Sequence, residues 1–301
     1  LVPKPFNLAI PRPLIRAAGI VLLVASLIFL VRAAIEADLA ELIASVDAQG
    51  AAMLSGLAVV YGAALGLLAL AWWLTLAKAD GVRHFLPAFI VYGLSVFPKY
   101  LPGSVFQYAS RQTLGARYGW RQRDIAKASA AEIILHLVAA LAIFLALDQA
   151  FGFDRMPGLV TAAFAAIVIG GVVFLAIRAP AIRARLFGAL IAQIFFFGIL
   201  ALIAAGCAIV FGASTRTAFD ASAMFLLAWL IGFITPGAPG GIGVREASVL
   251  VTTSAIMGPG PALLFAAATR IVTLGGDALF ALAALIAGQI RPREQASAGQ
   301  D

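Results

Sequence analysis

Ionisable side chains interrupt the long apolar stretches of this 301-residue chain at a few positions. Three are cations, three are carboxylates and one is an imidazole: Lys99, Arg245, Arg270, Glu132, Glu246, Asp277 and His136. A charge at the centre of a bilayer costs about 2.5–3.5 kcal/mol or more, so such residues usually belong to substrate pathways, proton relays or internal ion pairs. Glu132 and His136 are four residues apart and share one helix face, which we expect to point into the protein rather than toward lipid. The pattern predicts a polar site inside a membrane protein, unless ion pairs between helices account for all of these charges.

Two breaks rich in proline and glycine accompany these charges, one in each half of the chain. The first covers residues 97–104 and the second covers residues 235–246. Backbone that opens inside a bilayer must be buried in protein or line a cavity, and interrupted segments in corresponding positions of two halves typically mark a transporter's binding site. A helix that starts at such a break presents N–H groups and the positive end of its dipole to a phosphate or carboxylate. The alternative is that proline and glycine only make tight turns between packed helices.

The composition excludes a soluble domain. Hydrophobic residues make up 63% of the chain and charged residues only 12%, against about 25% charged residues in soluble domains. The chain has a net charge of +7, and its basic residues lie mainly in short loops beside apolar segments. This distribution is typical of residues that set membrane orientation, and it argues against a nucleic-acid partner. The two histidines have no Cys or His cluster around them, so we expect no metal and no cofactor. Trp72, Trp73 and Trp120 are expected to anchor the chain at the membrane interface.

Apolar segments of two lengths predict the membrane architecture. Six are long enough to cross a bilayer: residues 14–31, 51–77, 125–147, 157–177, 186–211 and 262–290. Four shorter segments lie between them in two pairs: residues 85–97 with 104–115, and residues 219–234 with 244–257. These short segments reach only about 18–24 Å as helices, less than the roughly 30 Å hydrocarbon core. We therefore expect an all-α membrane protein with six full transmembrane helices and two re-entrant helical hairpins.

The distribution of basic residues tests this topology. With a cytoplasmic N-terminus, 15 basic residues fall in cytoplasmic segments and only Arg32, Arg155 and Arg216 fall outside, as the positive-inside rule requires. Both termini are then cytoplasmic. Residues 14–147 and 157–290 each read as two spans, a hairpin and a span, in opposite orientations. We expect one integral membrane domain over residues 1–301, built as an inverted-topology repeat.

The residues of both breaks resemble the signatures of a known family. The segment Lys-Tyr-Leu-Pro-Gly-Ser, which starts at Lys99 and leads to Arg111, is similar to the Lys-Tyr-hydrophobic-Pro-Gly segment of flippase-like membrane proteins, which include the transmembrane region of lysylphosphatidylglycerol synthases. The segment Pro-Gly-Gly-Ile-Gly-Val-Arg-Glu at residues 239–246 resembles the second signature of that family, Pro-Gly-Gly-hydrophobic-Gly followed by a polar pair with Glu. The resemblance implies movement of lipids between leaflets, with roles for Lys99, Arg111, Arg245 and Glu246.

We therefore expect a lipid flippase or scramblase of the bacterial inner membrane, not an enzyme. Its cargo would be an anionic or phosphate-containing lipid, such as an aminoacyl-phosphatidylglycerol-like, hopanoid-linked or polyprenyl-linked lipid. The expected substrate-binding residues are Lys99, Pro102, Gly103, Ser104, Arg111, Gly240, Gly241, Arg245, Glu246 and Arg270. Glu132, His136 and Asp277 are expected to gate the cavity or relay protons, with His136 the first choice because the pKa of histidine lies nearest neutrality.

Other functions stay open at this point. A secondary transporter of a small anion would use the same cavity, closed laterally to lipid. A membrane-embedded enzyme acting on lipid head groups would need a nucleophile with a base, or a carboxylate pair with a metal, and the sequence indicates neither. A non-catalytic partner of a lipid-synthesis complex is a further alternative. A membrane lipid is the expected binding partner, and a lipid-synthase partner and a homo-oligomer are both left open.

Overall fold

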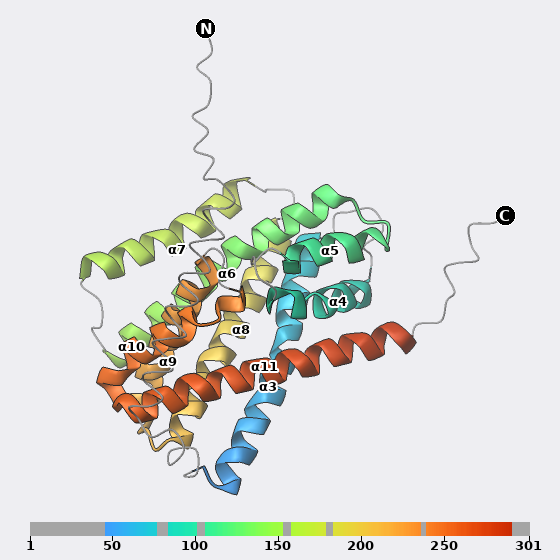
Figure 1. Cartoon of the computed structure of the whole chain (residues 1–301). Coiled ribbons are helices and arrows are strands. Elements are labelled where there is room, and N and C mark those ends of the chain that lie inside the picture. The colour runs from blue at the N-terminus through green and yellow to red at the C-terminus, as the bar shows by residue number, and fades with distance from the viewer. Residues whose placement is uncertain are drawn as a thin grey trace, which may run out of the picture.

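The structure is a computed structural model that describes residues 46–76, 84–100, 106–152, 158–178, 183–235 and 239–290. Within these ranges every regular element is a helix (Figure 1). Five helices are long and apolar enough to cross a membrane: α3 (Ala48–Leu76), α6 (Gln122–Phe151), α8 (Arg183–Val210), α9 (Thr215–Ile234) and α11 (Pro259–Ile290). The remaining elements are α4 (Phe85–Leu94), α5 (Phe106–Ala116), α7 (Gly158–Arg178), α10 (Val244–Met257) and the 3₁₀ turns η1 (Phe97–Tyr100) and η3 (Pro239–Gly241). The architecture is that of an all-helical, multi-pass membrane protein.

Most of these helices lie where hydropathy places them, but α9 is longer than expected. The predicted span at residues 14–31 lies outside the described residues. Helix α9 starts at Thr215, four residues earlier than expected, because the Ser214 hydroxyl accepts the Thr217 N–H at 3.2 Å and caps the helix. Its 20 residues reach about 30 Å, so length alone does not require α9 to turn back within the bilayer. The count of six spans with two re-entrant hairpins stays a prediction.

Helices of one half of the chain pack against helices of the other half in equivalent pairs. Helix α3 packs against α8, which are the second helices expected in each half. Helix α4 packs against α11, and in the same way α9 packs against α6. In each half, the helix that precedes the Pro/Gly break thus lies on the last long helix of the other half, so the two halves are interlocked rather than side by side. This arrangement brings η1 and η3 into contact.

Two of the three tryptophans that the sequence places at the membrane interface lie instead in the core. Trp72 is fully buried, and its ring lies 6.0 Å from that of Tyr92 and 6.1 Å from that of Trp120. Trp120 is also buried, whereas Trp73 is half-buried and packs edge-on against Phe85. The anchor prediction is therefore wrong for Trp72 and Trp120, because tertiary packing covers rings that hydropathy alone places near a segment end.

Helices α3 and α11 touch through their backbones at a pair of glycines. A Cβ atom added to Gly276 would lie 2.7 Å from the Ala58 carbonyl oxygen and 2.8 Å from the Gly62 nitrogen. Small residues at such crossings allow close backbone approach between membrane helices. Because Asp277 follows Gly276 directly, this crossing also fixes one wall of the polar site described below.

The substitution Gly276→Leu is expected to force α3 and α11 apart. Backbone atoms cannot move aside as a side chain can, so we expect a loss of at least about 1–3 kcal/mol of stability, measured as a lower thermal unfolding midpoint in detergent. The matched control is Gly56→Leu on α3, because nothing lies within 4 Å of a Cβ atom added there. Equal midpoints for the two variants would contradict the proposed packing role of Gly276.

Candidate functional site

The two Pro/Gly breaks meet in the interior of the protein. Gly240 of η3 packs directly on Tyr100 of η1, since a Cβ atom at Gly240 would lie 2.9 Å from the tyrosine ring. The φ angle of Gly240 is +56°, a conformation that favours glycine. Segments far apart in the sequence therefore form one site, and glycine at position 240 permits their close approach.

A cavity of about 350 Å³ lies at this meeting point, within the range of about 300–1,000 Å³ that is usual for ligand sites. Aromatic rings from α3, α4, η1, α5, α8 and α9 form much of its wall, together with the backbone of Gly240 and Gly241. Its ionisable residues come from both halves of the chain: Lys99, Arg111, Glu132, His136, Arg245 and Asp277. The cavity thus combines an apolar lining with a few polar groups, as binding sites commonly do.

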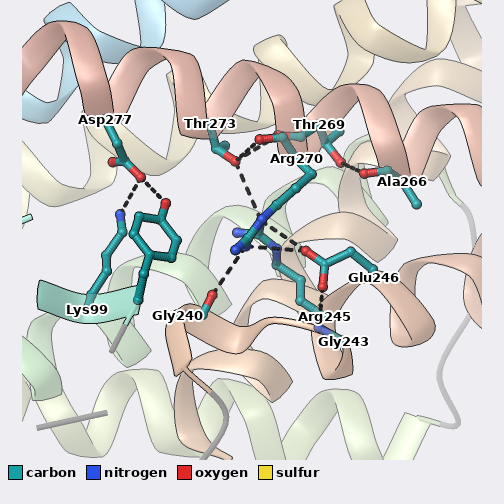
Figure 2. A network of polar contacts seen from close by, with 11 residues as sticks. Lys99, Gly240, Gly243, Arg245, Glu246, Ala266, Thr269, Arg270, Thr273 and Asp277 are labelled. Carbon is teal, nitrogen blue, oxygen red and sulfur yellow. Dashed lines mark hydrogen bonds and ion pairs between the residues drawn. The ribbon is translucent and has the colours of Figure 1, made fainter. Parts of the chain in front are cut away.

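On the η1 side of the cavity, Lys99 and Tyr100 bind Asp277 of α11. The Lys99 Nζ atom lies 2.7 Å from Asp277 Oδ2, and the Tyr100 hydroxyl donates to the same oxygen (Figure 2). Asp277 is fully buried, and its Oδ1 atom has no hydrogen-bond partner in the described part of the chain. Lys99 and Asp277 balance each other in charge and fasten the first break to the last long helix.

On the other side, the carboxylate of Glu246 occupies the N-terminus of α10. Its Oε2 atom accepts the Gly243 N–H at 2.7 Å, which caps the helix. Its Oε1 atom lies 3.4 Å from Arg245 Nη2 and 3.3 Å from Arg270 Nη1 (Figure 2). Well-formed Arg–carboxylate bonds are about 2.7–2.9 Å long, so both guanidinium groups are loosely held. One N–H donor of this helix end, that of Gly243, is therefore already bonded to a carboxylate of the chain itself, and ligand binding there stays a prediction.

Within the described part of the chain, the polar contacts of Arg245 are all near the limit of hydrogen bonding. Besides Glu246, its Nη2 atom approaches Thr273 Oγ1 at 3.5 Å, and its guanidinium carbon lies 5.9 Å from the centre of the Phe225 ring. The residue lies on the cavity wall and is 7% exposed. Arg270 similarly contacts the Gly240 carbonyl oxygen at 3.4 Å. These guanidinium groups therefore retain donors that a better acceptor can engage.

Arg111 and Glu132 form a buried ion pair that also contacts neighbouring hydroxyl groups and aromatic rings. Each residue is 3% exposed, and the pair joins α5 to α6. The Tyr92 hydroxyl donates to Glu132 Oε1 at 2.6 Å, and Arg111 Nε donates to Ser95 Oγ at 3.1 Å. The guanidinium also lies over the Tyr92 and Trp72 rings, 4.1 Å and 5.2 Å from their centres. These contacts fit a role in holding α4, α5 and α6 together more closely than a role in binding cargo.

His136 lies in the cavity wall among aromatic rings. It stacks on Phe233 and Trp229 at centroid distances of 5.4 Å and 5.8 Å, and its Nδ1 atom lies 2.9 Å from the Glu132 carbonyl oxygen. Both His136 and Glu132 are buried and line the cavity. The prediction that they face into the protein is confirmed, whereas proton coupling stays a prediction.

The charges at the site do not cancel. The four cations are Lys99, Arg111, Arg245 and Arg270, and the three carboxylates are Glu132, Glu246 and Asp277. Two cations have a carboxylate each, whereas Arg245 and Arg270 share Glu246. Among the residues that the structure describes, one positive charge is therefore in excess, and it resides at the start of α10. Among the described residues, no three His, Cys, Asp or Glu side chains are grouped in a way that could hold a metal ion.

Sequence reasoning selected the charged members of this site and missed its hydroxyl groups. Pro102, Gly103 and Ser104 lie outside the described residues, so their predicted role stays a prediction. Tyr100 and Thr273 were not selected, although Tyr100 adjoins Lys99 in the first break. Thr273 could also have been found, because it lies four residues before Asp277 and therefore on the same helix face.

Comparisons with known proteins do not identify this chain. No protein-family model, curated protein or solved structure matches it. The resemblance of the two breaks to flippase-like proteins therefore stays a prediction, and the function has to be argued from the cavity and its charges.

Proposed function

We propose that this protein moves an anionic, phosphate-containing lipid between the leaflets of a membrane. The observation that carries the proposal is the excess positive charge of Arg245 and Arg270, beside a cavity formed where the two breaks meet. An uncompensated charge at membrane depth is unfavourable, and a phosphate would compensate it. Guanidinium groups suit this task because their planar array of N–H donors matches two phosphate oxygens.

In this proposal the head group enters the cavity while the acyl chains stay in the bilayer. Arg245 and Arg270 bind the phosphate, and the loose contacts with Glu246 give way to it. The Lys99–Asp277 pair joins the first break to α11 and acts as a gate, while Glu132 and His136 complete the polar wall. No bond of the lipid is made or broken. The resemblance of the breaks to flippase-like proteins supports the same reading.

We further propose the inverted-repeat topology, with two re-entrant hairpins and both termini in the cytoplasm of a bacterial cell. Helix α10 has 14 residues and reaches about 21 Å, too short to cross the roughly 30 Å core. The exchange of α4 and α9 between the halves supports two equivalent units. The excess of basic residues on one side supports the orientation.

The transport proposal is tested with purified protein in lipid vesicles. Phosphatidylglycerol labelled with a fluorophore on its acyl chain is expected to exchange between leaflets faster than in protein-free vesicles, as a membrane-impermeant quencher would report. Inorganic phosphate trapped in the same vesicles is expected to stay inside. Efflux of phosphate without lipid exchange would favour a transporter of a small anion. The absence of both activities would contradict both functions.

Single cysteines test the proposed orientation. Two exposed positions are Ala126, near the start of α6, and Ala184, at the start of α8. Cysteines placed there, Ala126→Cys and Ala184→Cys, are expected to react with an impermeant maleimide only from the cytoplasmic side. Thr215→Cys at the start of α9 is expected to react only from outside. Native Cys207 is fully buried and serves as the unreactive background. Labelling of position 126 or 184 from outside would exclude the proposed hairpins.

A further inference from the structure

We infer that the cavity is matched to a head group with a single negative charge, a phosphodiester, and that Glu246 sets this preference; the inference rests on the proposed function. The charge balance motivates it, since the seven ionised groups of the site leave one positive charge in excess. The undescribed residues of the two breaks, 101–105 and 236–238, contain no ionisable side chain and do not alter this balance. A monoanion would therefore bring the site to neutrality.

Arg245 brings the excess charge to the wall of the cavity. The Lys99–Asp277 pair and the buried Arg111–Glu132 pair each balance one to one, so only Arg245 and Arg270 are under-compensated. Arg245 lies on the cavity wall, and the side chains of Glu246 and Arg270 keep 12% and 14% of their surface exposed. The group formed by Arg245, Glu246 and Arg270 is therefore the part of the site that determines which head-group charge is preferred.

Glu246 is fixed at this position by the backbone rather than by the arginines. Its Oε2 atom is 2.7 Å from the Gly243 nitrogen, whereas both of its contacts with guanidinium groups exceed 3.2 Å. A phosphate oxygen can thus approach both arginines more closely while the carboxylate keeps its cap on α10. The bound state would hold two cations, one fixed carboxylate and one phosphodiester. A doubly charged phosphomonoester would instead leave a net negative charge next to Glu246, in surroundings of low polarity where such a charge is costly.

Charge variants of this group should change which lipid is preferred. Glu246→Gln raises the excess to two positive charges and can keep the cap, because glutamine serves at this helix position as glutamate does. Arg270→Gln lowers the excess to zero. Arg245→Lys is the matched control, because it alters the geometry but leaves the charge unchanged.

The test compares leaflet exchange of two acyl-labelled lipids at pH 8 in vesicles of uncharged lipid. Phosphatidylglycerol is a phosphodiester with one negative charge, and phosphatidic acid is a phosphomonoester, a type of group that carries about 1.5–2 negative charges near neutral pH. The unaltered protein is expected to exchange phosphatidylglycerol about tenfold faster, a ratio that one uncompensated charge readily supplies. Glu246→Gln is expected to reverse the ratio in favour of phosphatidic acid. Arg245→Lys is expected to slow both lipids and keep the ratio.

The remaining arms separate the inference from the proposed function. Arg270→Gln is expected to slow both anionic lipids and to speed net-neutral phosphatidylcholine relative to them. A water-soluble diester, glycerophosphoglycerol, is expected to stay trapped inside the vesicles, and its release would assign the same site to a soluble ligand. If no lipid exchanges in the unaltered protein, the proposed function itself fails. Two outcomes overturn only the charge preference, provided that lipids exchange in the unaltered protein. In the first, the ratios stay the same in folded Glu246→Gln or Arg270→Gln protein. In the second, both variants lose all exchange.

Discussion

Arg245→Ala is expected to abolish leaflet exchange of phosphatidylglycerol while leaving a folded, membrane-inserted protein. Among the described residues its polar contacts are long, 3.4 Å to Glu246 and 3.5 Å to Thr273, so we expect little loss of stability when the side chain is removed. Hydrogen bonds to charged groups contribute about 1.5–3 kcal/mol each, and loss of two such bonds to a phosphate would weaken binding by roughly a hundredfold or more. The rate of lipid exchange in reconstituted vesicles measures the effect.

Two further variants serve as controls for Arg245→Ala. Arg245→Lys is expected to recover part of the rate, because lysine keeps the charge but lacks the planar pair of donors. Arg123→Ala removes a cation from an exposed position at the start of α6 and is expected to leave the rate unchanged. A folded Arg245→Ala protein that transports at the normal rate would remove the anion site from the mechanism. A misfolded one would make Arg245 a structural partner of Glu246.

The largest loss of stability is expected from Glu132→Leu. Arg111 is almost fully buried and would keep its charge without a counter-ion, a situation that costs about 3–5 kcal/mol in buried ion pairs. We expect a much lower thermal unfolding midpoint, or no accumulation of the variant in the membrane. Tyr92→Phe, which removes only a hydroxyl from the same cluster, is expected to cost about 1 kcal/mol.

The double variant Arg111→Met with Glu132→Leu separates charge from packing. Replacing both members of a buried pair with apolar residues of similar size is often neutral, so the double variant is expected to regain most of the stability that Glu132→Leu loses. If it unfolds as readily as the single variant, the loss comes from packing in the α4–α5–α6 region rather than from an unpaired charge.

The sequence could predict the helices that are long and uniformly apolar, and it could place the breaks. Helices α3, α6, α8 and α11 follow directly from hydropathy, and α10 starts at Val244, as its Gly-rich approach indicates. The start of α9 was missed because the polar residues Thr215, Arg216 and Thr217 lower the local hydropathy. Only the cap formed by Ser214 shows that the helix begins with them.

The charged members of the site could be predicted, but their pairing could not. Lys99 and Asp277 are far apart in the sequence, and only the packing of η1 on α11 determines that they bind each other. Arg111 was expected to bind cargo, although its partners Glu132, Tyr92 and Ser95 come together only in the folded chain. The occupied end of α10 could have been foreseen, because an acidic residue three positions after Gly243 is a usual capping arrangement.

The central claim is that a lipid head group enters the cavity, and photochemical crosslinking from Phe233 tests it most directly. Phe233 lines the cavity, whereas Ile271 on α11 is 65% exposed and serves as the control position. Each would be replaced in turn by benzoylphenylalanine and irradiated in vesicles that contain phosphatidylglycerol with an isotopic label in the head group. Alkaline removal of the acyl chains then leaves label on the protein only if the crosslink joins the head group itself. We expect retained label at position 233, its loss in combination with Arg245→Ala, and none at position 271. Absence of retained label at position 233, or equal label at both positions, would contradict the account.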